Sequence, residues 1–380
     1  MVTRSSPDYE VTLHRDVAAA AEPWARLEAS GWLTPYQRRG WAQAWLETIG
    51  AAEGVEPLIV EIGRGGAPVA LLPLGMARAT GCRIAFFLGR RHNNYNMPLY
   101  AEAGSGPTAD DWRGLLGEVA RRAGIDIFEF ANQPRAWRCA DNALAGLDSS
   151  HAASPSYVLR LSPDFEALAR EKRSAKALQQ LRRKARKLEE RLGEVRFATA
   201  VMPGERVAVL EAMESHRRDR AATAGVPSFF DVAGAADFTA RTASEGELRL
   251  DYLSAGGTIV AAYAGAVHGG RYSCFLNSFL ARDGLDAVSP GDQMLHHLIE
   301  RVCAEGLTDF DLGIGTERYK LAWCEPEMLS DATIAFTARG RMRGIARRGV
   351  NGAKRRIKNS PALWGLWKRL RPRRESAAAD

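Results

Sequence analysis

Apolar residues recur along the chain with two different spacings, which predict strands and helices in alternation. Alternating or continuous apolar runs predict strands in the first part of the chain at 8–15, 57–62, 68–76, 83–89 and 125–131. Apolar positions three and four apart predict helices at 17–30, after Thr34-Pro35 with Trp41, Trp45, Leu46 and Ile49 on one face, and at 109–123. These elements form one α/β unit that ends near residue 160.

The second part of the chain repeats this plan. Strands are predicted at 194–199, 247–255, 258–269, 271–281, 308–312 and 331–338, and helices at 203–219, 233–245 and 291–304. In both parts, helices precede antiparallel strands, and a further helix and strand follow. We interpret this as a weak internal duplication and expect an α/β fold with mixed sheets.

A basic segment separates the two parts. Pro163-Asp164 can begin a helix, and neither Gly nor Pro interrupts the sequence before Gly193. Within it, leucines and one alanine recur with the 3-4-3-4 spacing of a coiled-coil seam at Leu178, Leu181, Ala185, Leu188 and Leu192. The seam needs a partner, either a helix of this chain or another subunit. The predicted divisions are 1–162, the basic helical link 163–193, 194–338 and the tail 339–380.

Charge is concentrated in the tail. Residues 339–374 carry fourteen Lys or Arg and no Asp or Glu, whereas the first 338 residues carry 38 basic and 43 acidic residues. With Trp364, Trp367 and neighbouring leucines, the tail resembles a basic amphipathic segment. Three interpretations stay open: an anionic membrane surface, a solvated end that packs a few aromatics, and nucleic-acid binding.

The cysteines and the apolar runs indicate the compartment. The five cysteines are widely spaced and form no CxxC or Cys/His cluster, so we expect reduced thiols and no metal site. The first residues lack the apolar core of a signal peptide, and no run of eighteen apolar residues occurs. These features predict a cytoplasmic protein, peripheral on the inner membrane if the tail binds lipid.

One helix start is a candidate anion site. Ser289, Pro290, Gly291 and Asp292 begin the helix predicted to end at 304. Backbone N–H groups at a helix N-terminus can bind a phosphate of an acyl donor. The alternative is an ordinary helix start with proline in its first turn.

Charged and aromatic residues follow the next strand. Asp311 and Glu317 are candidate general bases, because strand ends and their loops carry reacting groups in α/β proteins. Alternatively, Asp311 caps a turn and Glu317 pairs with a neighbouring cation. Tyr319 is a candidate for substrate binding, and Lys320 either stabilises negative charge on a reacting oxygen or is a solvated lysine.

A polar loop in the first part is a candidate acceptor site. Arg90, Asn94 and Tyr95 combine amides, a phenol and a cation, which suits a sugar or an anionic acceptor. The alternative is a solvated loop. His268, His296 and His297 are interpreted as mainly structural.

The order of these motifs resembles GNAT-type acyltransferases. The likeness is greatest to the bacterial cellulose-biosynthesis acetyltransferases of the CelD/BcsL type, which are similar to the Fem-type aminoacyl transferases with two GNAT-like halves. It rests on the basic helix from Lys176, the helix after Ser289 and the series Asp309–Lys320 with Trp323. The resemblance implies two tandem GNAT-like halves and a lysine, Lys320, near the reacting carbonyl. It also implies acyl transfer from acyl-CoA, in the first place acetyl-CoA, to a hydroxyl or amine of an envelope polysaccharide or its precursor.

The sequence departs from GNAT proteins at one point. The usual pyrophosphate loop, Gln/Arg-x-x-Gly-x-Gly/Ala, is absent, and the segment from Arg282 to Gly291 stands in its place. Two alternatives therefore remain open. One is a Fem-like transferase that uses charged tRNA, and the other is a non-catalytic GNAT scaffold that acts as an adaptor in envelope polysaccharide synthesis.

Overall fold

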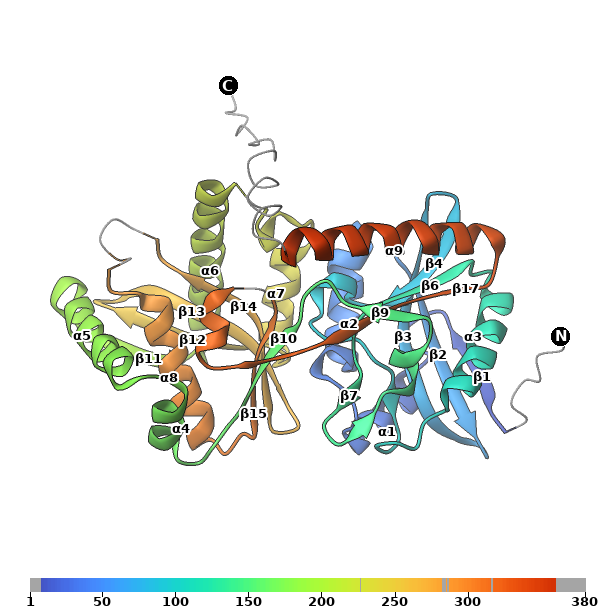
Figure 1. Cartoon of the computed structure of the whole chain (residues 1–380), viewed down its shortest axis with the longest axis horizontal. Helices are drawn as coiled ribbons and strands as arrows, with labels where there is room; N and C mark the ends of the chain where they lie inside the picture. The colour runs from blue at the N-terminus through green and yellow to red at the C-terminus, as the bar shows by residue number, and fades with distance from the viewer. Residues whose placement is uncertain (1–7, 226, 282–284, 286, 316, 360–380) are drawn as a thin grey trace, which may run out of the picture.

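The chain folds into two α/β halves that lie side by side, as Figure 1 shows. The computed structural model describes residues 8–225, 227–281, 285, 287–315 and 317–359. Each half is built around one mixed sheet with helices packed on it, which confirms the predicted fold class.

The first sheet contains eight strands. They are β1 (Glu10–His14), β2 (Glu56–Arg64), β3 (Ala67–Ala79), β4 (Cys82–Phe87), β5 (Leu99–Tyr100), β6 (Ile127–Pro134), β9 (Ser149–His151) and β17 (Leu329–Ala335). Their order is β1-β2-β3-β4-β6-β17-β9, with β5 beside β3. Every neighbouring pair is antiparallel except β4 and β6.

The second sheet has the same plan. Its strands are β10 (Ser156–Arg160), β11 (Val195–Thr199), β12 (Arg249–Ala255), β13 (Thr258–His268), β14 (Arg271–Phe279), β15 (Asp309–Ile314) and β16 (Glu325–Glu327). Their order is β11-β12-β13-β14-β15-β10-β16, and β14–β15 is the parallel pair. A separate two-stranded ladder joins β7 (Ala136–Trp137) and β8 (Ala140–Asp141).

Helices connect the parallel strands and cover the sheets. They are α1 (Ala21–Ser30), α2 (Arg39–Trp45), α3 (Ala109–Ala123), α4 (Phe165–Lys172), α5 (Ala175–Leu192), α6 (Pro203–Ala224), α7 (Ala235–Ser244), α8 (Pro290–Ala304) and α9 (Ala338–Asn359). A parallel pair needs a crossover connection, which α3 provides between β4 and β6, and α8 between β14 and β15. The predicted duplication is therefore visible in the topology.

Each sheet contains a strand from the other part of the chain. The strand β10 precedes the link but pairs with β15, while β17 follows the second half and pairs with β6. Figure 1 shows these two strands crossing between the halves in opposite directions. The sheets therefore do not coincide with the divisions 1–162 and 194–338, because the apolar pattern of a strand does not specify which sheet it joins.

The link is two helices, where the sequence predicted one. Arg173 is extended after α4, and the Ser174 side chain accepts a hydrogen bond from Ala177 N to begin α5. A serine N-cap can begin a new helix directly after another one, so the break needs neither Gly nor Pro. On α5, Leu181 and Leu188 are buried and the helix contacts α8, β11 and β12, so the partner of the seam lies in the same chain.

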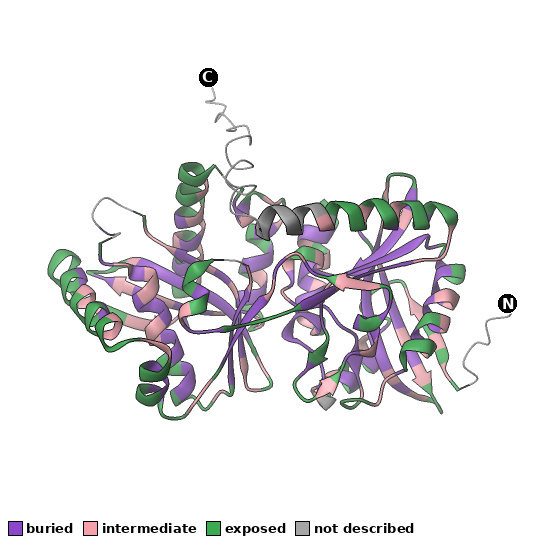
Figure 2. Cartoon of the chain, viewed as in Figure 1, coloured by how far each residue is buried: buried purple, intermediate pink, exposed green. Residues whose placement is uncertain are grey.

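The two halves share a hydrophobic core. One core cluster fills the first half and continues into the helices α6 and α7, while a second lies between the other face of the second sheet and α4, α5 and α8. Trp41 of α2 contacts Phe238 and Phe275 edge-on, with ring centroids 5.0 Å apart in each case. Figure 2 shows the buried strands between more exposed helices in both halves.

The first part of the basic tail packs as α9 on the first sheet. The buried carboxylate of Glu129 pairs with Arg343 at 2.6 Å and Arg347 at 2.8 Å. Residues 338–350 are therefore a structural element with one free face, on which Met342 and Ile345 are exposed. Trp364 and Trp367 lie outside the described residues. Within the described part of the chain, no helix is long and apolar enough to cross a membrane.

Candidate active site

The parallel strands β14 and β15 pair over a short distance and then separate. Register is kept only from Arg271–Asp309 to Ser273–Asp311, although β14 continues to Phe279 and β15 to Ile314. Strands that separate leave backbone N–H and C=O groups without ladder partners, and these groups need others. The gap between the two strands is therefore the place where side chains or a ligand complete the structure.

A cavity of about 540 Å³ lies where β14 ends and α8 begins. Its lining comes from β13, the end of β14, the start of α8, the loop after β15, α6 and the turn between α4 and α5: Arg173, Arg220, Tyr263, Asn277, Ser278, Phe279, Ser289, Pro290, Gly291, Asp292, Tyr319 and Ala322. The structure thus brings the four predicted helix-start residues together with Tyr319 in one cavity.

Cations surround the start of α8. Arg173 forms a two-pronged ion pair with Asp292 at 2.8 and 3.0 Å, and Lys184 Nζ donates to Ser289 Oγ at 2.8 Å. Arg220 of α6 lies 5.2 Å from the ring centre of Phe279. Asp292 balances the charge of Arg173, so the N-terminus of α8 with Lys184 and Arg220 makes this rim of the cavity favourable for an anion.

The tyrosine predicted to bind substrate forms part of the cavity wall. Asn277 Nδ2 donates to Tyr319 Oη at 3.0 Å and lies 3.4 Å from Tyr263 Oη. Burial raises the pKa of Tyr319 above its usual value, with the charge of Glu317 acting in the same direction. Tyr319 is therefore a neutral phenol at pH 7 and can donate a proton into the cavity.

Lys320 is buried, which contradicts the alternative of a solvated lysine. Its Nζ donates to the carbonyl oxygens of Gly313 at 3.2 Å and Ile314 at 2.9 Å, and pairs with Glu317 at 3.2 Å. Desolvation would raise the pKa of Glu317, but the Lys320 ammonium, hydrogen bonds and the charge of Arg220 together outweigh it, and the pKa is lowered. Glu317 is thus ionised at neutral pH. Lys320 supplies hydrogen bonds to the backbone carbonyl groups at the end of β15, next to the cavity.

Asp311 is fully buried and has structural partners. Its Oδ1 accepts from Gly313 N at 2.7 Å, and its Oδ2 pairs with Arg271 at 3.1 Å. This corresponds to the interpretation in which Asp311 caps a turn. Asp311 does not line the cavity.

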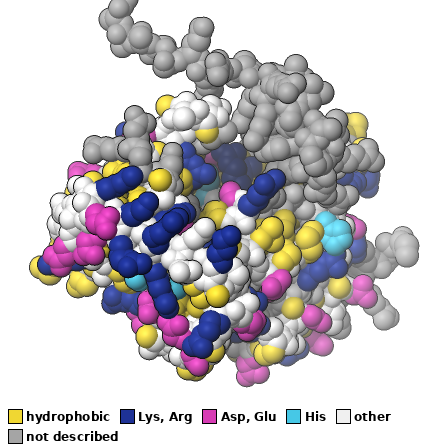
Figure 3. Space-filling view, turned by 60° about the vertical axis from the view of Figure 1, so that its left-hand side comes forward, with side chains coloured by type: hydrophobic (Ala, Val, Ile, Leu, Met, Phe, Trp, Pro, Cys, Tyr) yellow, Lys and Arg dark blue, Asp and Glu magenta, His cyan; other side chains and the backbone are white. Residues whose placement is uncertain are grey.

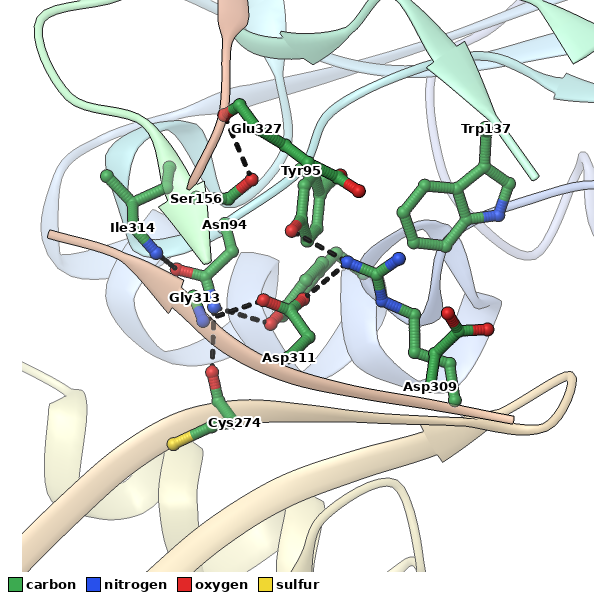
Figure 4. Close-up of polar contacts among 12 residues, drawn as sticks. Asn94, Tyr95, Trp137, Ser156, Cys274, Asp309, Asp311, Gly313, Ile314 and Glu327 are labelled. Carbon is green, nitrogen blue, oxygen red and sulfur yellow. Dashed lines mark hydrogen bonds and ion pairs between the residues drawn. The ribbon is translucent and has the colours of Figure 1, made fainter. Parts of the chain in front are cut away.

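The polar loop of the first half is absent from the cavity lining. Arg90 lies over the ring of Phe86 at 3.9 Å, Tyr95 is buried and receives a hydrogen bond from Arg271, and Asn94 contacts the second half. Figure 4 shows Asn94 and Tyr95 directed toward β14 and β15 from the opposite half. These three side chains therefore lie outside the cavity that contains Tyr319, and their role in binding an acceptor stays a prediction.

Sequence reasoning missed the contribution of α6. His216 is buried with Nδ1 3.3 Å from Ser278 Oγ, and Arg217 Nη1 donates to Asn277 O at 2.8 Å. The available signal was helical spacing, because His216 continues the buried face formed by Val209 and Met213. That pattern places the histidine on the packed face but does not show that the face borders a cavity.

Burial determines the protonation of two of the histidines and of a cysteine on β14. Burial lowers the pKa of His268 and His296 to about 4, so that both are neutral at pH 7, and raises that of Cys274 to about 12. Among the described residues, no three or more His, Cys, Asp or Glu side chains are grouped to hold a metal ion.

Comparison with known proteins defines the class. Residues 175–321 match the family described as Acetyltransferase (GNAT) domain. The second half therefore carries a GNAT acetyltransferase domain, and the protein is an acyltransferase. No curated protein matches the chain.

Solved structures share the two-halved fold. FemX has a TM-score of 0.58 at 10% sequence identity, and the match covers 86% of this chain and 97% of FemX. A conserved protein of unknown function from Bacteroides thetaiotaomicron has a TM-score of 0.52 at 12% identity, with 86% and 100% covered. At such identities the likeness is one of fold.

Proposed function

We propose that the protein transfers an acyl group, in the first place acetyl, from acyl-CoA to a hydroxyl or amine of an envelope polysaccharide or its precursor. The observation that carries this proposal is the cavity beside the separated strands β14 and β15, with cations at one rim and Tyr319 in its wall. The acceptor class rests on the resemblance to cellulose-biosynthesis acetyltransferases.

The donor fits this cavity in two parts. An extended thioester arm carries amide groups, which suit the backbone of β14 where this strand continues past its pairing with β15 and lines the cavity. Its phosphates suit the N-terminus of α8 with Arg220 and Lys184 beside it. These two cations, from α6 and the link, supply positive charge where the pyrophosphate loop of other GNAT proteins is absent.

The chemistry requires two proton movements. The acceptor oxygen or nitrogen attacks the thioester carbonyl carbon and loses its proton to the Glu317 carboxylate, directly or through water. The carbon–sulfur bond breaks, and the leaving thiolate takes the proton of the Tyr319 phenol. Lys320 holds Glu317 ionised and fixes the carbonyl oxygens of β15, which is a positioning role for this buried lysine.

A binding titration tests the donor site. Calorimetry of the full chain with acetyl-CoA should give a stoichiometry near one, and Arg220→Glu should weaken binding by about a hundredfold, because it reverses a charge beside the donor phosphates. Arg113→Glu is the matched control, since Arg113 lies on α3 of the first half and pairs with exposed Asp148. Absence of binding to the wild-type chain would refute the donor assignment.

Acyl transfer then tests the reaction itself. Release of free CoA thiol should accelerate when polysaccharide oligomers or nucleotide-linked sugar precursors are added to the chain with acetyl-CoA. The same assay with Tyr319→Phe shows whether the thiol comes from this site. Thiol release that ignores every acceptor would indicate thioester hydrolysis instead of transfer.

The outer surface favours a second candidate function, transfer of an aminoacyl group from charged tRNA. The exposed face of α5 carries six cations: Lys176, Arg182, Arg183, Arg186, Lys187 and Arg191. Figure 3, which turns the second half forward, shows Lys and Arg side chains in a row across this surface. This candidate predicts tRNA binding that falls steeply with salt and is lost in Arg183→Glu/Arg186→Glu/Lys187→Glu. If the same triple variant binds acetyl-CoA as the wild type does, the tRNA site and the acetyl-CoA site are separate.

A further inference from the structure

An amide of the first half spans the gap between β14 and β15. Asn94 Nδ2 donates to Cys274 O of β14 at 2.8 Å, and Asn94 Oδ1 accepts from Ile314 N of β15 at 3.2 Å. Figure 4 shows this side chain between the two strands. A carboxamide offers the same donor and acceptor as a peptide group, so Asn94 occupies the place of one rung of backbone between strands that no longer pair.

The end of β15 depends on side chains for its backbone hydrogen bonds. Asp311 accepts from Gly313 N, Asn94 accepts from Ile314 N, and Lys320 donates to the carbonyl oxygens of both Gly313 and Ile314. Buried backbone groups without a hydrogen-bond partner destabilise the fold, which is why such groups are almost always paired. The strand is therefore held away from β14 by a set of side chains, and Asn94 among them bonds the backbone of both strands.

Two further features hold the amide in place. Asn94 Nδ2 also donates to Tyr36 Oη at 2.8 Å, and Tyr36 is buried in the core of the first half. Gly313 adopts a φ of +67°, and a Cβ added there would lie 2.5 Å from Asn94 Nδ2. A glycine in the left-handed region is thus what permits Asn94 to approach β15.

We infer that Asn94 is a positioning residue for acyl transfer and that the first half sets the width of the cleft in the second. This inference rests on the proposed function, since the cleft is where the thioester carbonyl would meet Tyr319. Asn94 reaches the two strands from the first half and does not line the cavity. It therefore acts through β15 and not by contact with the donor. One half of the molecule thereby serves as a fixed template for the other.

The test compares Asn94→Ala and Asn94→Asp with Asn132→Gly. Asn132 has a φ of +56°, which glycine adopts without strain, and its Nδ2 donates to Asn93 O of the same half. Asn132→Gly therefore removes a nearby side-chain amide but leaves the bonds from Asn94 to β14 and β15 in place. Hydrogen exchange of the Ile314 amide is read without donor, and kcat and KM for acetyl-CoA are measured alongside.

Asn94→Ala should accelerate exchange of Ile314 at least tenfold and lower kcat by about tenfold, while Asn132→Gly leaves both unchanged. Asn94→Asp keeps an acceptor for Ile314 N and should preserve slow exchange. It loses the bond to Cys274 O, so its kcat should lie between the kcat of Asn94→Ala and that of the wild type. Unchanged exchange in Asn94→Ala overturns the inference, and so does faster exchange with a wild-type kcat. A wild-type chain that transfers no acyl group refutes the proposed function instead, because exchange still reports whether Asn94 holds the strands.

Discussion

The two halves contain the same separated pair of parallel strands, but the two gaps are filled to different extents. The cavity beside β14 and β15 has a volume of about 540 Å³, and the one beside β4 and β6 about 160 Å³. In the first half, β4 and β6 pair at Ile84–Ile127 and Ala85–Phe128 and then separate. The loop after β4 fills that gap, because Asn93 Nδ2 donates to Leu88 O at 2.8 Å and Asn96 Nδ2 to Ala131 O at 3.0 Å. The same architecture is thus largely filled by the protein's own side chains in the first half, whereas the larger cavity in the second half leaves room for a ligand.

The helices that connect the two pairs of strands also differ, in the charges at their N-termini. Thr108 and Asp111 form a capping box at the start of α3, and Asp110 adds a second negative charge. At α8, Asp292 is paired with Arg173 while Lys184 and Arg220 lie nearby. A helix N-terminus attracts anions unless carboxylates already satisfy it. Of these two helices, α8 is therefore the one suited to a phosphate, because its carboxylate Asp292 is neutralised by Arg173.

The largest expected effect separates the two halves by catalysis. Tyr319→Phe should lower kcat about a thousandfold, since general acid catalysis contributes roughly 10²–10⁴. Tyr100→Phe is the matched change, because Tyr100 is the buried tyrosine beside the hollow at the start of α3. Steady-state kinetics of both variants measure the difference. Equal losses of kcat would show that the contrast between the halves is wrong.

Stability should show the reverse contrast. Asn93 is buried, accepts from Trp41 Nε1 at 3.0 Å and donates to Leu88 O and Asn96 Oδ1. Asn93→Ala leaves several of these groups unpaired and should lower the free energy of unfolding by about 3 kcal/mol. Chemical denaturation measures this value, and Asn277→Ala at the open cavity should cost less than half as much because water can replace its bonds. A smaller loss for Asn93→Ala than for Asn277→Ala would contradict the filled-gap description.

The cations around α8 should affect donor affinity alone. Arg220→Ala should raise the KM for acetyl-CoA about tenfold and leave kcat within twofold, because a phosphate far from the reacting carbonyl is bound equally in ground and transition states. Arg113→Ala, which removes an exposed cation of the first half, should leave KM unchanged. Initial rates over a range of donor concentrations decide the point. A fall in kcat with constant KM would place Arg220 near the chemistry instead.

The sequence predicts the elements better than their assembly. Apolar spacing locates the strands and helices of both halves, and turn residues such as Gly291 mark where α8 begins. It does not predict that β10 and β17 exchange sheets, because an apolar strand fits either core. It also does not reveal Asn94, whose partners Cys274 and Ile314 are about two hundred residues distant, since a polar loop residue looks solvated until its contacts are known.

The smallest expected effect concerns the protonation of Glu317. Burial alone would raise its pKa, but the Lys320 ammonium lowers it, so the acid limb of kcat/KM should lie below the usual glutamate value of about 4.3. Lys320→Met takes away the largest effect that lowers this pKa and should move the limb to higher pH by about one unit. Lys320→Arg keeps the positive charge and should leave the limb in place, even if both variants lose activity through the carbonyls of β15. The position of the limb, unlike its height, is independent of that loss, so an acid limb that stays fixed in Lys320→Met would exclude Glu317 as the base.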